Sequence, residues 1–174
     1  MKKLGLIGGL SWRSTLRYYQ IINEQVARRK GGLHSAPLVM ENFDFVEVGH
    51  CVTAEDWDGA AAALTRAARQ LEASGAQALV ICANSMHVIY DRIAAEIGIP
   101  IIHIADTVGA KMQADGVKSA AIVGTRNVMT EKFYRQRLVG YGISLLPPDM
   151  DLAGRVDGIV YDELMLGKVS RESE

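Results

Sequence analysis

The segment QALVICANSMH, residues 77–87, is the stretch that decides how this chain folds. Residues 78–81 form a short apolar run that contains Val and Ile, which is typical of a strand buried on both faces of a parallel sheet. Cys82 follows at once, and small and polar residues and then a helical pattern come after it. A strand that ends where a helix begins places these residues at the carboxyl edge of a parallel sheet, where α/β proteins bind ligands.

Cys82 is therefore a candidate functional thiol. The unpaired N–H groups and the dipole of a helix start favour negative charge, so we expect a thiolate that can act as a base at neutral pH. The alternative is a small thiol buried in the core, which is common for a free cysteine. Position alone does not separate the two interpretations. Asn84 and Ser85, two polar residues just past the strand, favour the functional one.

The composition describes a globular protein of one domain or two small ones. Its 174 residues are 49% hydrophobic and 22% charged, with a formal net charge of −1. This balance offers no basic face for nucleic acid, and no apolar run is long enough to span a membrane. The two cysteines, Cys51 and Cys82, argue against a disulfide scaffold and fit a reducing compartment. We therefore expect a cytoplasmic protein without nucleic-acid or membrane partners.

Strand and helix patterns alternate along the whole chain. Strands are predicted over residues 3–7, 36–43, 78–81, 101–104, 119–123 and 143–146. Helices are predicted up to residue 30, over 57–73, 86–96, 106–115 and 129–139, and from 149 or 151 to 166. The first helix should carry Leu16, Tyr19, Ile22 and Val26 on one face, and residues 44–55 form a polar segment that holds Cys51. The alternation predicts an α/β fold with parallel sheets and helices on both faces.

Two segments of the chain resemble each other. Residues 4–20, LGLIGGLSWRSTLRYYQ, and residues 120–136, AAIVGTRNVMTEKFYRQ, both run from a strand through a glycine turn and a polar loop to an aromatic helix. Chance is the alternative, because every α/β unit has a strand and a glycine turn, but the match of YYQ to FYRQ favours two similar lobes. We expect the first lobe over residues 1–104 and the start of a second over 105–174.

The second lobe is expected to be incomplete at residue 174. Cys82 lies 74 residues after Gly8, and the equivalent position of the second lobe would fall near residue 198. Either the chain continues beyond residue 174 or the protein departs from the two-lobe scheme.

Five short motifs follow one another along the chain: GGLSW (residues 8–12), GLHSA (32–36), CANSMH (82–87), IHIAD (102–106) and GTR (124–126). Together they resemble the aspartate/glutamate racemase family over essentially the whole chain. The resemblance implies two pseudo-symmetric α/β lobes, an active site in the cleft between them, and a homodimer. It also implies an isomerase that acts on a small-molecule amino acid substrate and needs no pyridoxal phosphate, metal or other cofactor.

The resemblance also implies roles for individual residues. Racemisation needs a base on one face of Cα and an acid on the other, and Cys82 matches the first of the family's two catalytic thiols. Lys168 matches a lysine that some aspartate-specific members use for the side-chain carboxylate, with a solvated surface lysine as the alternative. For Asn84 and Ser85 the alternative is helix capping. The positions that match binding of the substrate's α-carboxylate offer neutral donors and are Gly9, Ser11, Asn84, Ser85 and Thr125.

Three features depart from the family pattern. The second cysteine, usually in a Gly-Cys-Thr-Glu run, is absent from these 174 residues, and Cys51 is interpreted as a surface or loop thiol. The segment FDFVEV, residues 43–48, stands where aspartate-specific members carry an arginine, which argues against strict aspartate specificity. Ser85 stands where threonine is commoner and keeps the hydroxyl.

Other functional signatures are weak or missing. His87 and His103 are widely separated in the sequence, which makes a metal site a weak interpretation, so no metal site is predicted. His87 falls in the first turn of a predicted helix, from which it can reach the cleft. The segment GLIGG, residues 5–9, lacks the spacing of a dinucleotide fingerprint, and neither a phosphate loop nor a nucleophile elbow occurs.

Three hypotheses therefore stand. The leading one is a racemase of acidic or other polar amino acids that exchanges protons through two cysteines. The second is a cysteine isomerase or decarboxylase of the same superfamily, of the maleate isomerase or arylmalonate decarboxylase type, with Cys82 as nucleophile or lone proton donor. The third is a non-catalytic protein that keeps the carboxylate cleft with one thiol, which gains weight if residue 174 is the true end.

Overall fold

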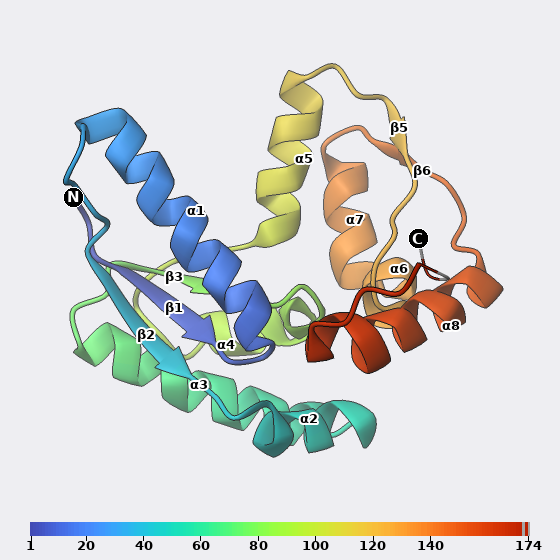
Figure 1. The fold of residues 1–174 in the computed structure, drawn as a ribbon, viewed down its shortest axis with the longest axis horizontal. Helices are drawn as coiled ribbons and strands as arrows, with labels where there is room; N and C mark the ends of the chain where they lie inside the picture. Colours follow the sequence, from blue (N-terminus) through green and yellow to red (C-terminus); the bar gives the residue numbers. More distant parts are fainter. Residues whose placement is uncertain (172, 174) are drawn as a thin grey trace. The chain divides into compact units, whose positions relative to one another are not determined.

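The computed structural model describes residues 1–171 and 173 of the protein. The chain forms two compact units, Met1–Ile102 (unit 1) and His103–Glu174 (unit 2), each with a hydrophobic core of its own. Both units mix strands and helices (Figure 1).

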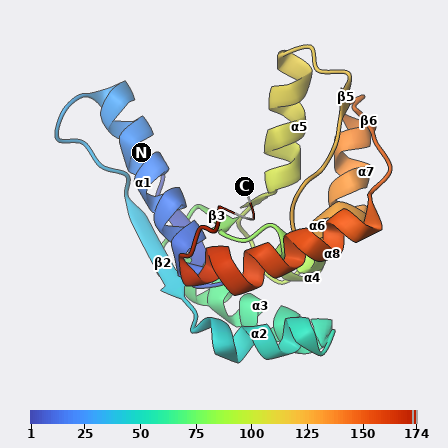
Figure 2. The same ribbon diagram turned by 45° about the vertical axis from the view of Figure 1, so that its right-hand side comes forward.

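Unit 1 is built on a parallel sheet with the strand order β2-β1-β3-β4. Its strands are β1 (Leu4–Gly8), β2 (Leu38–Asn42), β3 (Ala78–Ile81) and β4 (Ile101–Ile102). β1 pairs with β2 from Leu4↔Leu38 to Gly8↔Asn42, and with β3 from Leu4↔Ala78 to Ile7↔Ile81. Figures 1 and 2 show α1 (Trp12–Lys30) on one face of this sheet and α3 (Trp57–Ala73) on the other. The predicted α/β fold with a parallel sheet flanked by helices is confirmed.

Helix α3 forms because its sequence is rich in alanine and its apolar residues repeat at helical spacing. Asp56 caps its start by accepting a hydrogen bond from the N–H of Gly59 at 2.8 Å, and Gly75 follows its end at φ +84°. Its inner face packs against β1 and β3, where Ile7, Leu79 and Ile81 complete the core. The residues buried on that face are Ala60, Ala61, Leu64, Ala67, Ala68 and Leu71.

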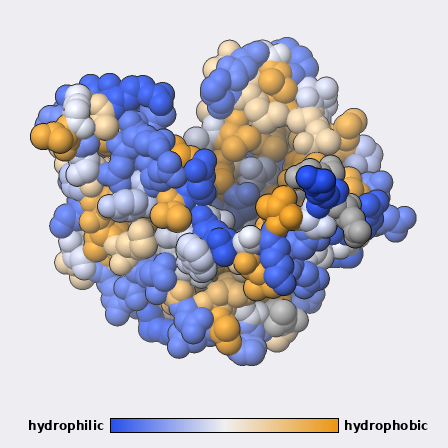
Figure 3. Space-filling model, in the orientation of Figure 1, coloured by the Kyte–Doolittle hydropathy of each residue, from blue (hydrophilic) through white to orange (hydrophobic). Residues whose placement is uncertain are grey.

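Helix α1 has an apolar face that differs from the predicted one. Leu16 and Tyr19 are 54% and 48% exposed, whereas Thr15 is buried against the sheet at 3% exposure. Thr15 lies against Gly8 of β1, where a Cβ would come within 2.5 Å of its Cγ2. On the face of unit 1 seen in Figure 3, hydrophobic residues are interspersed with hydrophilic ones, which is ordinary for a protein surface.

The predicted polar segment over residues 44–55 contains helix α2 (Phe45–Thr53). Asp44 caps it by accepting from the N–H of Val46 at 3.1 Å. Cys51 lies within this helix, is half-buried and packs against the main core, and a Cβ added at Gly59 of α3 would lie 3.2 Å from its Sγ. Cys51 therefore lies in a helix and not in a loop, and its thiol is only partly exposed.

Unit 2 contains α5 (Ile104–Ala114), β5 (Ser119–Ala120), α6 (Arg126–Thr130), α7 (Lys132–Gly140) and β6 (Ser144–Leu145), followed by α8 (Met150–Gly158). A π-helical turn, η2 (Ile159–Glu163), and a 3₁₀ turn, η3 (Leu164–Leu166), come after α8. β5 and β6 pair in parallel. The helix predicted over residues 129–139 is two helices, because Glu131 is extended at ψ 149°. The buried residues of this unit's main hydrophobic cluster are Ala105, Val128, Tyr134, Leu138 and Ile143.

Among the residues that the structure describes, no helix is both long and apolar enough to cross a membrane.

Candidate functional site

The topology of unit 1 brings two of the sequence motifs to one edge of the sheet. From β1 the chain crosses to β2 on one side and later to β3 on the other, so the carboxyl ends of β1 and β3 form the switch point where α/β sheets bind ligands. Ile7 pairs with Ile81, and extending this register by one residue places Gly8 beside Cys82. The N–H of Cys82 donates to the carbonyl of Ile7 at 2.9 Å and continues this ladder. The glycine turn and the Cys82 segment therefore share one edge.

The turn after β1 can be formed only by glycine. Gly9 has φ +79°, and a Cβ there would lie 2.0 Å from the backbone oxygen of Phe43. A Cβ at Gly8 would lie 2.5 Å from Cγ2 of Thr15 and 3.4 Å from Oδ1 of Asn42. These close approaches pack the turn against the first part of α1 and the end of β2.

The N–H of Gly9 has a partner within unit 1. It donates to Oγ1 of Thr15 at 3.0 Å, and that hydroxyl donates to the carbonyl of Ser11 at 3.1 Å. Gly9 therefore contributes the shape of the turn, while its N–H is already bonded. Ser11 precedes α1 in an extended conformation, and within the described part of the chain its hydroxyl makes no capping bond to that helix. Sequence reasoning assigned no site role to Thr15, which stands one helical turn after Ser11.

Cys82 is fully buried, at 0% exposure. Side chains alternate between the two faces of a strand, so Cys82 faces away from Leu79 and Ile81. In agreement, Leu79 and Ile81 belong to the main core cluster of described residues and Cys82 does not. Burial raises the pKa of the Cys82 thiol from 9.0 to about 12, because the charged thiolate loses its solvation. The expectation of a thiolate stabilised at neutral pH is therefore wrong for the protein without substrate.

The helix that was expected to stabilise this thiolate is shorter than predicted. In place of one helix over residues 86–96, the chain forms a five-residue 3₁₀ turn, η1 (Ser85–Ile89), and then α4 (Tyr90–Ala94). The effect of a helix dipole needs aligned peptide groups and acts within the first turn, so a short 3₁₀ segment provides little of it. Desolvation thus dominates at Cys82.

Burial of Cys82 predicts a loss of stability in alkali. Below pH 9 the thiol is protonated in both the folded and the unfolded protein; between pH 9 and about 12 only the unfolded chain ionises, so stability falls as pH rises. By about pH 10.5 the loss should reach about 2 kcal/mol relative to about pH 8. Urea unfolding of the wild type and of Cys82→Ala at both pH values isolates this contribution. Equal pH dependence of the two proteins would contradict it.

Asn84 and Ser85 follow Cys82 at the same edge. Asn84 is exposed and Ser85 is half-buried. Within the described residues, the Asn84 side chain makes no capping bond to η1, so the capping alternative has no support for Asn84. Its backbone carbonyl accepts the N–H of His87 at 3.1 Å. The amide side chain of Asn84 is thus presented to solvent at the switch point.

Thr125 lies in unit 2, at the residue before α6. Its Oγ1 is buried and, among the described residues, has no hydrogen-bond partner. Buried hydroxyls are nearly always satisfied, so this one stands out.

The neighbouring N–H, that of Arg126, donates to Oδ1 of Asp157 at 2.7 Å, and the two side chains form an ion pair with Nε 3.6 Å from Oδ2. Burial, together with the charge of Asp157, raises the pKa of Tyr161.

Lys168 is exposed and follows Gly167, which ends η3 at φ +76°. Its backbone N–H donates to the carbonyl of Glu163 at 2.9 Å, which fixes the main chain and leaves the side chain in solvent.

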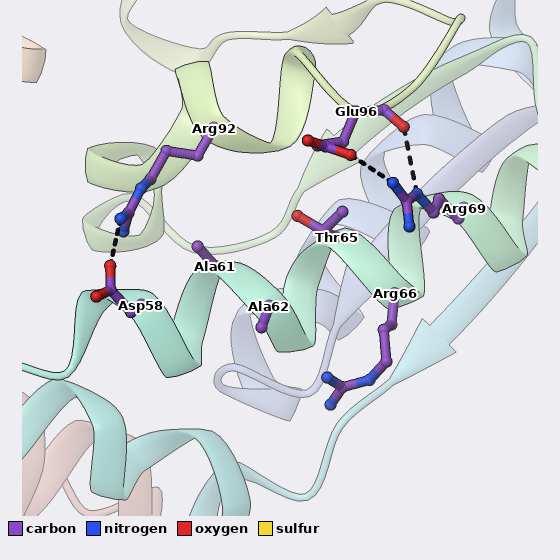
Figure 4. Close-up of a pocket in the computed structure, with 8 residues that line it drawn as sticks. All are labelled: Asp58, Ala61, Ala62, Thr65, Arg66, Arg69, Arg92 and Glu96. Carbon is purple, nitrogen blue, oxygen red and sulfur yellow. Dashed lines mark hydrogen bonds and ion pairs between the residues drawn. The ribbon is translucent and has the colours of Figure 1, made fainter.

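Unit 1 also has a groove of about 480 Å³ between α3 and α4 (Figure 4). Ion pairs join Arg92 to Asp58 and Arg69 to Glu96 across it. Their side chains are half or more exposed, so each pair contributes little to stability. None of the predicted site residues is among the described residues that line it, which are Asp58, Ala61, Ala62, Thr65, Arg66, Arg69, Arg92 and Glu96.

Over the described residues, no three His, Cys, Asp or Glu side chains form a group that could hold a metal ion.

Comparison with known proteins adds an independent observation. Among solved structures, the chain is 42% identical to a Yersinia pestis protein described provisionally as an Asp/Glu racemase, with a TM-score of 0.90 over 99% of this chain and 76% of that one. An aspartate racemase homologue from Pyrococcus horikoshii OT3 is 30% identical, with a TM-score of 0.80 over 97% of this chain and 74% of that one. An aspartate racemase from Picrophilus torridus shares the fold at 17% identity, with a TM-score of 0.76 over 99% and 73% of the two chains.

The sequence signature of one family matches residues 7–171, which is nearly all of the chain and includes both the glycine turn and Cys82. The chain therefore belongs to the Asp/Glu/hydantoin racemase family.

Proposed function

We propose that the protein is a cofactor-independent racemase of acidic or other polar amino acids, with Cys82 as one of two thiols that exchange a proton at Cα. The observation that carries the proposal is the position of Cys82 at the β1–β3 switch point, beside the glycine turn, in a chain of a racemase family. The hydroxyl of a serine or threonine at this position would be too weak an acid to exchange the proton.

The proposed reaction needs one group on each face of Cα. Cys82 rests as a neutral thiol, since burial holds its pKa near 12. In the direction that starts from this state, a second thiolate removes the Cα proton, and Cys82 donates its own proton to the opposite face. One C–H bond breaks and one forms, Cys82 is left as the thiolate, and the reverse direction exchanges the roles. The substrate's α-ammonium group is a cation that would favour this thiolate.

The second thiol is proposed to lie beyond residue 174. Cys51 is no candidate, because it is held in α2 against the core of unit 1. Support for a longer protein comes from the solved relatives, of which this chain covers 73–76%. We propose that the extra polypeptide completes a second lobe, pseudo-symmetric to the first, and that the protein assembles as a homodimer.

Neutral donors are proposed to hold the substrate's α-carboxylate. Asn84 offers an exposed amide, and the hydroxyls of Ser11 and Ser85 lie at the same edge of unit 1. Thr125 offers a buried hydroxyl whose lack of a partner among the described residues is explained if a carboxylate accepts from it. Gly9 shapes the turn that places these groups, and the ammonium group of Lys168 is proposed to bind a side-chain carboxylate of the substrate.

Thr125 provides a test that separates function from stability. Thr125→Val keeps the shape but removes the hydroxyl, so KM should rise about 10-fold, as expected for one lost hydrogen bond to a charged group. Stability should stay level or rise by about 1 kcal/mol, because a buried hydroxyl without a described partner is removed. Steady-state kinetics and thermal unfolding check both, with Thr125→Ser as the control that keeps the donor. A lower stability of Thr125→Val with unchanged KM would contradict the role.

Hydrogen exchange at Cα in D₂O tests the proposed function itself. The intact protein is incubated with a panel of L- and D-amino acids, and NMR follows both the Cα signal and the enantiomer ratio. Solvent deuterium in both enantiomers supports racemisation. Exchange without inversion supports the single-thiol isomerase or decarboxylase. Binding without exchange supports the non-catalytic carboxylate-binding protein. Either of the last two outcomes overturns the racemase.

A further inference from the structure

His87 is a buried imidazole three residues past Asn84. Its side chain is 1% exposed, and its Nδ1 lies 2.9 Å from the carbonyl oxygen of Ala83 and 3.2 Å from that of Asn84. Carbonyl oxygens only accept hydrogen bonds, so Nδ1 must carry the hydrogen in both contacts. The tautomer and the orientation of the ring are thereby fixed by the backbone of the segment that leads from Cys82 to Asn84.

Other contacts also hold this segment, since Ala83 packs against the main core cluster. The N–H of Cys82 donates to Ile7 at 2.9 Å and anchors its first residue to the sheet. After that the chain leaves β3, and regular structure resumes only with the five-residue turn η1. A 3₁₀ turn of this length fixes its neighbours weakly. The His87 ring contacts the carbonyl of Ala83, which lies between Cys82 and Asn84, and the carbonyl of Asn84, which also accepts the backbone N–H of His87 at 3.1 Å.

We propose that His87 is a positioning residue, which holds Cys82 and Asn84 in place by donating Nδ1–H to the carbonyls of Ala83 and Asn84. The inference rests on the proposed racemase, because it is the placement of the Cys82 thiol against Cα that His87 secures. The role requires a donor at Nδ1 and no proton transfer by the ring. A buried polar side chain that makes two contacts to one short segment also rigidifies that segment when both are satisfied.

Two isosteric variants separate the donor from the rest of the ring. In His87→Asn the amide nitrogen can occupy the place of Nδ1, whereas in His87→Gln it reaches the place of Nε2. We expect His87→Asn to keep kcat within about 3-fold of the wild type, since the donor is retained. His87→Gln should lose about 100-fold in kcat, as for a reacting group displaced by about 1 Å, with KM changed much less. The pH profile of His87→Asn should match that of the wild type.

A second measurement needs no substrate. In a Cys51→Ala background, the rate of Cys82 alkylation by iodoacetamide reports on the placement of the thiol. We expect His87→Asn to match the wild type and His87→Gln to differ by about 5-fold or more, because local unfolding of the segment exposes the thiol. Thermal unfolding of all variants controls for global loss of structure.

The outcomes are distinguishable. Equal kcat values and equal alkylation rates for His87→Asn and His87→Gln overturn the positioning role. A His87→Asn protein that fails to fold overturns it too, and so does one whose pH profile loses one of its limbs. An active His87→Gln with an inactive His87→Asn would assign proton transfer to the Nε2 side and also overturns it. If the wild type shows no Cα exchange, the racemase proposal fails, while the alkylation rates still decide whether His87 holds the segment.

Discussion

Replacing Cys82 by serine is expected to abolish racemisation and to leave carboxylate binding intact. Serine has nearly the shape of cysteine, but its hydroxyl is a far weaker acid than a thiol, so it can neither supply nor accept the proton. The loss should be about 10²–10⁴-fold in the rate of racemisation, the usual contribution of a general acid or base. Racemisation is followed by NMR in D₂O, and binding of a substrate-like dicarboxylate is followed by calorimetry.

Cys51→Ser is the matched control for this change. Cys51 is the other cysteine of the 174 residues and packs half-buried in α2, so its loss should affect stability and spare racemisation. The role of Cys82 would be contradicted if Cys82→Ser racemised the substrate at the wild-type rate. It would also be contradicted if Cys82→Ser lost binding along with racemisation, because the thiol is not one of the proposed carboxylate ligands.

Elements with a strong local pattern were predictable from the sequence. β3 was predicted over residues 78–81 and α3 over 57–73, and both are found there. In each case the apolar pattern, the alanine content and the flanking cap or glycine point to the same structure. The parallel order of the strands followed from their alternation with helices, because parallel neighbours need a crossover.

Elements that depend on tertiary packing were harder to predict. Residues 44–55 carry several charges, yet Asp44 caps a helix there whose Val48 is 2% exposed. The helix predicted over residues 86–96 is broken into η1 and α4, with no proline or glycine in the sequence to signal the break. At this point Nδ1 of His87 lies 2.9 Å from the carbonyl oxygen of Ala83, which would be the α-helical acceptor of the His87 N–H, and that N–H bonds the carbonyl of Asn84 instead.

The candidate site was only partly visible in the sequence. The motifs placed Cys82 at a strand end, but the adjacency of Gly8 and Cys82 depends on β1 and β3 being neighbours, which is a matter of sheet order. The pKa of Cys82 depends on three-dimensional burial, and strand position alone indicated the wrong direction. Thr15 could not be found from its type, because its importance comes from its hydrogen bond to Gly9.

Replacing Gly9 by alanine is expected to destabilise unit 1 by about 2–5 kcal/mol, as the sum of two costs. Alanine at φ +79° costs about 1–2 kcal/mol, because its Cβ approaches the following carbonyl oxygen. The added Cβ would also lie 2.0 Å from the oxygen and 2.4 Å from the nitrogen of Phe43, and neither backbone atom can rotate away. Relief requires the end of β2 to move, which adds about 1–3 kcal/mol. Urea unfolding measures the total.

Gly75→Ala separates the two costs, because it shares the backbone conformation without the clash. Gly75 has φ +84°, and the nearest atom to a Cβ there is Nζ of Lys3, at the end of a flexible side chain, at 3.5 Å. This variant should therefore lose only about 1–2 kcal/mol. If the two variants are equally destabilised, the close approach of Gly9 to Phe43 imposes no cost, and the turn would tolerate a side chain. If Gly9→Ala is much less stable than Gly75→Ala, the switch point is held by backbone packing that only glycine permits. The placement of Ser11 and Cys82 at that edge then depends on this packing.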